Sequence, residues 1–215
     1  MTDVDRIVRA MIKEIGYTDP SIGFAASTCQ VQCNIHSQSP DISVGFDSGG
    51  AGDQGMMFGF ACRETRSLMP LPIYLAHRLV ENHARMRKNG ELSFVRPDAK
   101  SQVTYDYKRK RIDTFLISTQ HTKHASLEDV REAVQTVMQE TAKAYELNTD
   151  FKALVNPTGR FVIGSSFADT GVTGRKIIAD TYGGACRHGG GAFSGKDPTK
   201  VDRSGAYMAR KIAKA

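Results

Sequence analysis

The chain has 215 residues, enough for one large domain or two small ones. Apolar residues make up 40% and charged residues 24%, which excludes a disordered tail and a collagen-like repeat. No run of about 18 apolar residues occurs and the start is acidic, so we expect no membrane span and no signal peptide. Four cysteines without framework spacing favour a reducing, cytoplasmic setting.

The excess positive charge lies in the last quarter of the chain. The net charge is +6, and residues 159–215 hold ten Lys and Arg against four Asp, whereas residues 1–158 are neutral. This quarter is also rich in glycine, and cations interleaved with glycine let a polyanion approach the backbone. We therefore expect it to bind the phosphates of a nucleotide or of a nucleic acid.

The first elements along the chain are a helix, a strand and a loop. Apolar residues at 3.6-residue spacing predict a helix over residues 4–15, with Thr2 as its N-cap and Gly16 at its end. Alternation predicts a strand over residues 24–35, and the Gly- and Asp-rich stretch 37–55 is loop-like.

Helices and strands alternate through the rest of the chain. The predicted elements are a strand at 56–62, a helix at 72–88, paired strands at 101–107 and 112–119, a helix starting at Ser126, a strand at 161–164 and a helix at 207–214. This order predicts a layered α+β fold rather than an all-parallel sheet. The opening helix has nothing before it to cover its apolar face, and the chain stops inside a helical pattern. Both ends therefore look cut, and we expect a fragment.

Three local patterns have both a functional and a plain structural interpretation. The series Cys29, Cys33 and His36 matches no standard zinc spacing, so we favour two core cysteines on a strand. The basic stretch Lys108–Arg111 is typical of a solvated hairpin tip. Nucleic-acid binding is disfavoured, since aromatics are 8% of the chain and tryptophan is absent. His188 suits acid–base chemistry or a structural hydrogen bond, and its spacing does not decide between them.

A glycine loop near the C-terminus resembles a P-loop incompletely. The pattern from Gly190 to Lys196 is followed by Asp197, where a P-loop carries Ser or Thr for magnesium, and no apolar strand precedes it. We expect a loop in which Lys196 and backbone amides approach phosphate. The alternative is a surface glycine loop with solvated lysines.

Four stretches together resemble the S-adenosylmethionine synthetase (methionine adenosyltransferase) family. They are Gly50–Gly55 (Gly-Ala-Gly-Asp-Gln-Gly), Arg96–Val103 (Arg-Pro-Asp-Ala-Lys-Ser-Gln-Val), Asn156–Gly164 (Asn-Pro-Thr-Gly-Arg-Phe-Val-Ile-Gly) and Asp180–Asp197. The resemblance covers nearly the whole chain. It implies a fold of repeated two-layer α/β domains, with a remnant of the N-terminal domain at 1–43, a complete central domain at 44–161 and the start of the C-terminal domain at 162–215.

The resemblance also implies a reaction and its ligands. ATP, L-methionine and water give S-adenosylmethionine, phosphate and diphosphate: the methionine sulfur attacks the ribose C5′, and the released tripolyphosphate is then hydrolysed. Such a reaction needs alignment of sulfur with carbon, and positive charge at the leaving triphosphate. The implied cofactors are Mg²⁺ (two ions per site) and K⁺, and the implied assembly is a homodimer or homotetramer with sites between subunits. No nucleic-acid or membrane partner is expected.

Site residues carried over by the resemblance fall into four sets. The ATP-binding set is Asp98, Ala99, Lys100, Arg160, Phe161, Asp169, Arg175, Lys176, Ala192 and Lys196, of which Lys100, Arg175 and Lys196 are the expected catalytic residues. The methionine set is Gln38, Asp169 and Lys200. Asp202 resembles a magnesium ligand, and Asp53 resembles an active-site carboxylate.

The sequence departs from the family at its start. The family's His-Pro-Asp-Lys signature is absent, and with it a catalytic histidine, a magnesium aspartate and upstream glutamates. The loop at residues 45–49 is also shorter than the family's gate. We therefore expect very low turnover by this chain alone, or a non-catalytic copy that binds ATP or tripolyphosphate or pairs with an intact subunit. A basic nucleic-acid binder is a further alternative.

Overall fold

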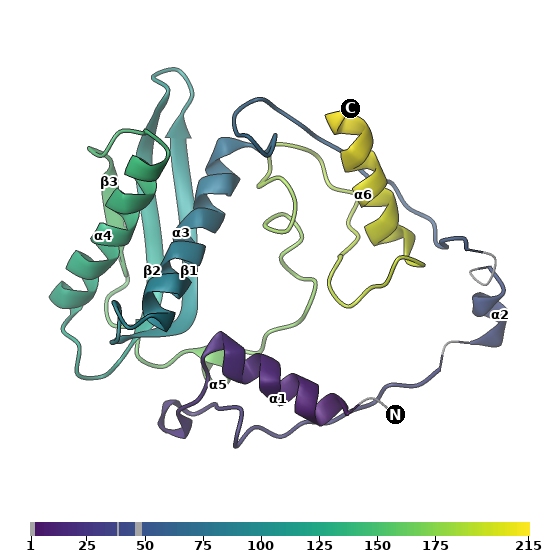
Figure 1. Ribbon diagram of the computed structural model, residues 1–215, viewed down its shortest axis with the longest axis horizontal. Helices are drawn as coiled ribbons and strands as arrows, with labels where there is room; N and C mark the ends of the chain where they lie inside the picture. The colour runs from purple at the N-terminus through teal and green to yellow at the C-terminus, as the bar shows by residue number, and fades with distance from the viewer. Residues whose placement is uncertain (1–2, 38, 46–48) are drawn as a thin grey trace. The chain divides into compact units, whose positions relative to one another are not determined.

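Residues 3–37, 39–45 and 49–215 are described by a computed structural model of the chain (Figure 1). They form two compact units. The first comprises residues up to 33 together with 75–170, and we call it the sheet unit. The second comprises residues 34–74 and 171–215, and we call it the glycine unit. None of the helices in the described part of the chain combines the length and apolar character needed to cross a bilayer.

A three-stranded sheet organises the sheet unit. Strands β1 (Val95–Asp106) and β2 (Arg111–His121) pair antiparallel, and β3 (Lys152–Val155) adds to β2 in parallel, giving the order β1-β2-β3. At the hairpin turn, the Asp106 carboxylate accepts hydrogen bonds from the amides of Lys108 (2.9 Å) and Arg109 (3.0 Å). The predicted strand pair and its exposed basic turn are confirmed, and both strands are longer than predicted.

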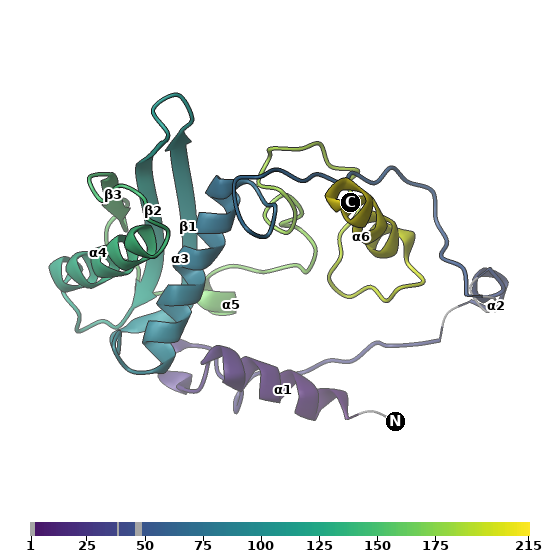
Figure 2. The same ribbon diagram turned by 45° about the horizontal axis from the view of Figure 1, so that its top comes forward.

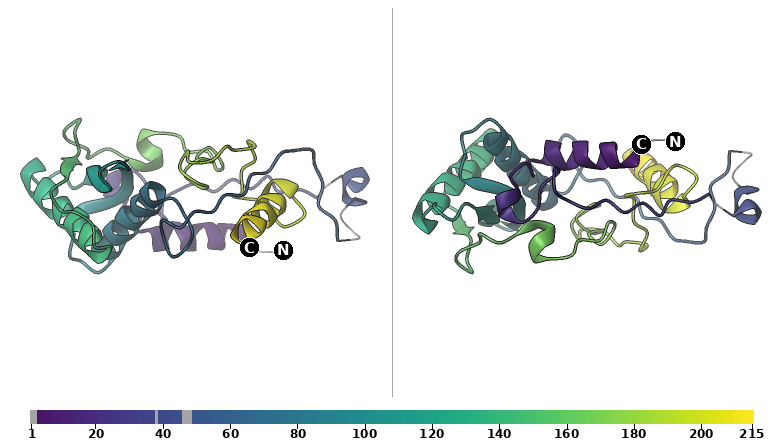
Figure 3. Two further views of the ribbon diagram at one scale, coloured as in Figure 1. Left: turned by 90° about the horizontal axis from the view of Figure 1, so that it is seen from above. Right: turned by 90° about the horizontal axis from the view of Figure 1, so that it is seen from below.

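Two 18-residue helices pack on one face of this sheet. They are α3 (Leu71–Lys88) and α4 (Leu127–Ala144), and Figures 2 and 3 show them side by side over the strands. Phe115 and Ile117 of β2 are fully buried beneath these helices. Leu79 of α3 and Val134 of α4 are fully buried as well. The predicted helices at 72–88 and after Ser126 are confirmed. The Ser126 hydroxyl accepts the Asp129 amide at 3.0 Å, as the capping pattern predicts.

The opening helix α1 (Val4–Ile15) is also confirmed, with one correction. It ends at Gly16, whose φ of 116° lies in the left-handed region that glycine adopts without strain. The N-cap is Asp3, whose side chain accepts the Arg6 amide at 3.0 Å, and not Thr2. The positive end of the helix dipole also stabilises a carboxylate at this position. The short helices η1 (Pro20–Ile22) and α5 (Ser165–Ala168) complete the sheet unit.

Three predicted strands do not form. Residues 24–35, 56–62 and 161–164 are irregular, although Phe161 pairs through its backbone with the end of β2. Alternation indicates which residues share a face, but a strand also needs a neighbouring edge to pair with. Conversely, β3 was not predicted, because four residues are too few to show a period. The mixed α+β class itself is confirmed.

The glycine unit contains little regular structure. Besides the first residues of α3, its described helices are α2 (Pro40–Ser43) and α6 (Val201–Lys214), and α6 begins six residues earlier than the predicted helix at 207–214. Arg210 of α6 donates to the carbonyl oxygens of Ser67 (2.7 Å) and Leu68 (3.1 Å), which ties the 60s segment to this helix. Tyr182 is buried and packs edge-on against Phe60, with ring centroids 5.8 Å apart.

Candidate functional site

The predicted site residues are distributed over both units. The sheet unit holds Asp98, Ala99, Lys100, Arg160, Phe161 and Asp169, and the glycine unit holds Asp53, Arg175, Lys176, Ala192, Lys196, Lys200 and Asp202. Gln38 lies outside the described residues.

Asp98 and Lys100 share the face of the sheet that α3 and α4 leave open. Successive strand residues point to opposite faces, so Ala99 lies toward the helices and offers only its backbone to the open face. The Asp98 carboxylate accepts the amide of Ser165 at 2.9 Å. Ser165 has a φ of 63°, an uncommon conformation for a residue with a side chain, and this hydrogen bond helps to hold it. Lys100 is exposed.

Gly164 allows the chain to cross this open face closely. A Cβ at Gly164 would lie 2.8 Å from the amide carbon of Gln120, 3.0 Å from the Phe161 ring and 3.1 Å from the Asp98 carboxylate. The Gln120 amide also donates to the Val162 carbonyl at 2.9 Å. A side chain at this position would displace the Gln120 amide, so glycine lets the chain pass close to both Asp98 and Phe161.

Asn156 anchors the turn that carries Arg160 and Phe161. Its buried side chain accepts the Thr119 amide at 2.8 Å and donates to the Thr119 carbonyl at 3.0 Å, so it extends the β2–β3 ladder by one residue. Its own carbonyl accepts the Gly159 amide at 2.8 Å, which closes the turn. Asn tolerates the left-handed φ of 44° observed here.

His121 fixes the other end of the same turn. Its backbone amide donates to the Phe161 carbonyl at 2.9 Å, and its Nε2 accepts the Phe161 amide at 3.1 Å. Its Nδ1 lies 2.9 Å from the Thr122 carbonyl oxygen, so both ring nitrogens have hydrogen-bond partners. Phe161 is thereby held half-buried, while Arg160 and Asp169 are exposed.

The roles of Asn156 and His121 were missed by sequence reasoning. Asn156 stands in one of the family-like stretches, but nothing local shows that its amide reaches back 37 residues to Thr119. In the sequence, the available signal for His121 was a histidine placed shortly after a predicted strand.

A cavity of about 530 Å³ opens in the sheet unit beside this turn. Its lining combines Arg96, Lys123 and His124 with apolar side chains that include Phe167. Asp19 lies 3.4 Å from Arg96, and hydrogen bonds from the Ser21 side chain and amide keep the pKa of Asp19 low, with a smaller contribution from Arg96. The carboxylate therefore remains charged and neutralises part of the cationic wall.

In the glycine unit, the segment containing Asp53 lies beside Lys200. Gly52 forms a parallel bridge with Lys200, and its amide donates to the Thr199 carbonyl at 3.0 Å. Asp53 has a φ of 144°, and its carboxylate accepts the Gln54 amide at 2.7 Å. The glycines of the 50–55 stretch thus bring a carboxylate and a lysine from distant parts of the sequence into one neighbourhood.

Lys196 and Asp202 form the closest charge pair of the candidate site. The Lys196 Nζ lies 2.5 Å from Asp202 Oδ2, and the side chains are 29% and 24% exposed. Asp202 stands in the first turn of α6, where the helix dipole also favours a negative charge. The predicted phosphate-binding lysine and the predicted magnesium ligand are therefore bound to each other, a contact that the sequence did not indicate.

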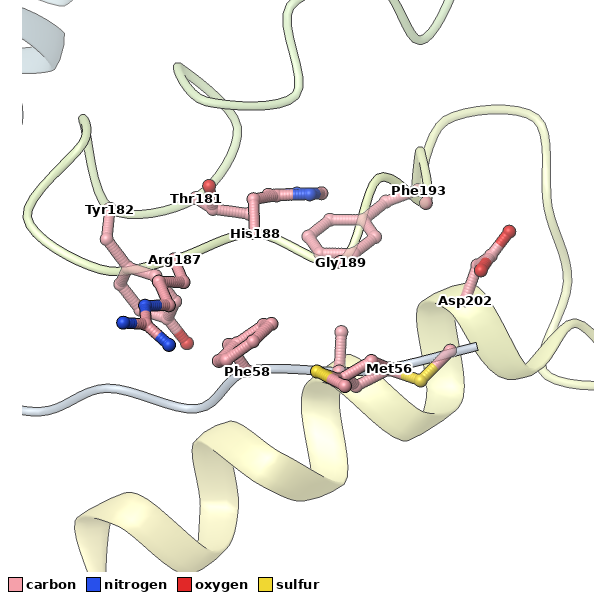
Figure 4. Close-up of a pocket in the computed structure, with 12 residues that line it drawn as sticks. Met56, Phe58, Thr181, Tyr182, Arg187, His188, Gly189, Phe193 and Asp202 are labelled. Carbon is pink, nitrogen blue, oxygen red and sulfur yellow. The ribbon is translucent and has the colours of Figure 1, made fainter. Parts of the chain in front are cut away.

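The glycine loop approaches this pair from the other side. A Cβ at Gly191 would overlap the Asp202 carboxylate, and Figure 4 shows Asp202 beside the strip that holds Gly189 and Phe193. The space enclosed by this strip, α6 and the Met56 region is about 20 Å³, which accommodates about one water molecule. This part of the unit is therefore closed and packed.

A larger cavity of about 500 Å³ lies on the other side of Lys196. Lys196, Arg203 and Lys211 line it together with Tyr207. The Arg203 guanidinium donates to the Lys196 carbonyl at 2.6 Å and to the Tyr207 hydroxyl at 3.2 Å. Asp197 also lines the cavity, so three cations stand against one carboxylate, and this excess of positive charge suits a multiply charged anion.

Arg175 and Lys176 are exposed cations on a neighbouring turn of the glycine unit. Gly174 packs against Ala192 so closely that a Cβ there would lie 2.7 Å from the alanine methyl. The loop that carries Lys196 and the turn that carries Arg175 and Lys176 are therefore adjacent.

Two other candidates have local partners. His188 accepts the Gly190 amide on Nδ1 at 2.7 Å, which is a structural hydrogen bond within the glycine loop. Cys29 is half-buried and Cys33 and His36 are exposed, so the predicted apolar strand face with two core cysteines is wrong. In the described structure, the irregular segment around Cys33 pairs with no strand that would bury this cysteine.

The donor set near Asp202 suits a magnesium ion only in part. No group of three or more His, Cys, Asp or Glu side chains gathers in the described ranges. Asp202 offers a single carboxylate, so most of the ligands of a cation here would come from phosphate and water. Mg²⁺ accepts such a shell of one or two carboxylates, phosphate oxygens and water, and to that extent the residues fit it.

Fold and site together define a mixed α+β protein with a cationic, glycine-rich unit. Residues 48–161 match the family description of the S-adenosylmethionine synthetase central domain, and residues 163–215 match that of the S-adenosylmethionine synthetase C-terminal domain. The chain therefore belongs to the S-adenosylmethionine synthetase family, as its motifs predicted. The family is one of transferases that make S-adenosylmethionine.

Proposed function

We propose that this chain carries ATP- and methionine-binding residues for the methionine adenosyltransferase reaction. The methionine sulfur lone pair attacks the ribose C5′, the bond from C5′ to the phosphate oxygen breaks, and tripolyphosphate leaves. Water then cleaves tripolyphosphate to phosphate and diphosphate. The protein's contribution is alignment of the reactants and stabilisation of charge on the leaving group.

In this proposal the sheet unit binds the nucleoside end of ATP. Phe161 supplies an aromatic surface held by His121, and Arg160 extends along the adenosine. Asp98 holds the irregular segment that crosses this face by accepting the Ser165 amide, and Lys100 on the same face is a proposed phosphate-binding lysine. Asp169 serves both adenosine and the methionine amino group.

The glycine unit would bind the triphosphate. Arg175, Lys176 and Lys196 supply its positive charge, and the small Ala192 side chain lets the loop backbone approach. Gln38 and Lys200 would contact methionine, and Asp53 adds a carboxylate beside Lys200. A Mg²⁺ ion held by Asp202 and phosphate would neutralise charge on the leaving group; its binding here, and that of K⁺, is part of the proposal.

The observation that carries this proposal is the adjacency of cations and glycines in the glycine unit. Lys196 lines the 500 Å³ cavity with Arg203 and Lys211, and the Gly174–Ala192 contact brings Arg175 close to the same loop. A polyphosphate is the ligand class whose charge matches this arrangement.

Product formation tests the proposal. Purified protein is incubated with ATP, methionine, Mg²⁺ and K⁺, and S-adenosylmethionine is measured by mass spectrometry. We expect slow formation that Lys196→Met reduces at least tenfold, because a leaving-group charge contact is typically worth about 10²-fold or more in rate. Lys110→Met, on the exposed hairpin turn, is the matched control and leaves the rate unchanged. Equal rates for wild type and Lys196→Met would contradict the assignment.

A second candidate function is binding without catalysis. It requires only the cations Lys196, Arg203 and Lys211, which line the 500 Å³ cavity of the glycine unit. This candidate predicts that tripolyphosphate raises the melting temperature, that Lys196→Ala abolishes the increase, and that no S-adenosylmethionine forms.

We also propose the domain division at residues 43/44 and 161/162.

We further propose that the chain assembles into a dimer or tetramer. Ile7, Met11 and Ile15 of α1 are 44%, 52% and 47% exposed, and they form one apolar face of this helix. Such a face favours association with another chain.

A further inference from the structure

We propose that Asp202 controls the availability of Lys196, so that a polyphosphate and a divalent cation each release the other's binding group. In the free protein the carboxylate neutralises the lysine, and the lysine occupies the carboxylate. The inference rests on the proposed function, because it concerns the regulation of the same phosphate site.

The backbone holds the two residues close together. Arg203, next to Asp202 in α6, donates to the Lys196 carbonyl at 2.6 Å. The Lys196 amide in turn donates to the Phe193 carbonyl at 3.2 Å. These hydrogen bonds hold the backbone segments of Lys196 and Asp202 close together, and this places the two side chains within the observed 2.5 Å.

The surroundings strengthen the pair. Both side chains are less than one-third exposed, so water screens their attraction less than at a surface. The Gly191 backbone lies so close to the Asp202 carboxylate that a Cβ there would overlap it, and this contact confines Asp202 near its present position. A ligand that needs Lys196 must therefore compete with a held carboxylate and not with bulk water.

Competition at both partners makes binding cooperative. A polyphosphate that draws Lys196 away exposes Asp202, and a cation at Asp202 frees Lys196. Because linkage is reciprocal, each ligand raises the affinity of the other by the same factor, which for such couplings is about 5- to 150-fold. The lone ligands bind weakly, and the cation–polyphosphate complex binds well.

Nearby Asp197 provides a matched control. It lies on the same loop, and its carboxylate accepts hydrogen bonds from the Thr199 side chain and amide, which keep the pKa of Asp197 low, with a smaller contribution from Lys200. Asp197→Asn therefore removes the same charge from the same region without touching the Lys196–Asp202 pair.

Calorimetric titration with tripolyphosphate in EDTA tests the proposal. We expect Asp202→Asn to bind metal-free tripolyphosphate about tenfold more tightly than wild type, the size expected of such a coupling. Asp197→Asn, which removes a charge from the cavity lining but leaves the Lys196–Asp202 pair in place, should differ from wild type less than threefold. Adding Mg²⁺ should tighten binding by wild type and leave Asp202→Asn unchanged. Asp202→Ser, which cannot retain a charge either, should behave like Asp202→Asn and guards against a defect peculiar to one variant.

Two results would overturn the proposal, and they are distinguishable. If wild type binds tripolyphosphate but Asp202→Asn and Asp202→Ser bind it no better than Asp197→Asn, Asp202 does not restrain Lys196 and only the inference is lost. If wild type binds no tripolyphosphate with or without Mg²⁺, the proposed function fails, and the inference fails with it.

Discussion

Acidification should destabilise the sheet unit through His83. This histidine of α3 is 2% exposed, and its Nε2 lies 2.9 Å from the Thr119 hydroxyl. That hydroxyl donates to the Gln120 carbonyl at 3.2 Å, so its oxygen accepts from Nε2–H of a neutral ring. Burial lowers the pKa of His83 to about 4, and the charge of Arg87 contributes to the same direction.

The sign of the effect follows from proton uptake. Between about pH 6.5 and pH 4 the unfolded chain protonates this histidine and the folded chain does not, so the free energy of unfolding falls as the pH falls. The full difference between the two pKa values corresponds to about 3 kcal/mol, reached near pH 4. Since domains are stable by only about 5–15 kcal/mol, this is a large fraction.

Hydrogen–deuterium exchange of β2 peptides, corrected for the intrinsic pH dependence of exchange, measures this effect in the sheet unit. His83→Gln should flatten the loss of protection between pH 6.5 and pH 4.5. His77→Gln, which changes an exposed histidine on the same helix, should leave the loss intact. The reasoning would be refuted if His83→Gln and wild type lost protection in parallel, or if NMR gave His83 a pKa near 6.5.

Two further predictions concern hydrogen bonds that hold the sheet unit together. Asn156→Ala leaves the buried amide and carbonyl of Thr119 without their partners, and should lower the free energy of unfolding by about 3 kcal/mol in urea denaturation; a loss below about 1 kcal/mol would contradict the proposed ladder extension. Ser126→Ala removes the N-cap of α4 and should lower the free energy of unfolding by about 1 kcal/mol, whereas Ser126→Asp should retain the wild-type stability. Equal stability of Ser126→Ala and wild type would show that the cap is dispensable.

Long periodic elements of this fold could be predicted from the sequence. The helices at 4–15 and 72–88 and the helix after Ser126 repeat their apolar spacing over several turns, and the hairpin pairs two alternating runs across a polar turn. Residues 24–35 alternate just as well but remain irregular, because alternation says nothing about whether a partner strand is near. The four residues of β3 are ordered by pairing with β2, a long-range contact with no local pattern.

The candidate site was predictable as a set of residues but not as a set of contacts. The family-like stretches identified Asp98, Phe161 and Lys196, and the charge distribution pointed to the final quarter, which contains Phe161 and Lys196. Hydrogen bonds across about 40 residues, such as those of His121, leave no mark on neighbouring sequence. The Lys196–Asp202 pair was missed for a different reason: each residue had been assigned to a ligand, and neither assignment considered the other.

The central claim is that the cations of the glycine unit bind one polyphosphate, and lysine reactivity tests it most directly. The full-length chain is acetylated briefly with and without Mg²⁺–tripolyphosphate, and modification of each lysine is measured by mass spectrometry. Binding as described shields Lys176 and Lys196 of the glycine unit together, while Lys110 on the hairpin turn reacts equally in both samples. Unchanged reactivity of Lys176 and Lys196, or uniform shielding of all three lysines, would contradict the claim.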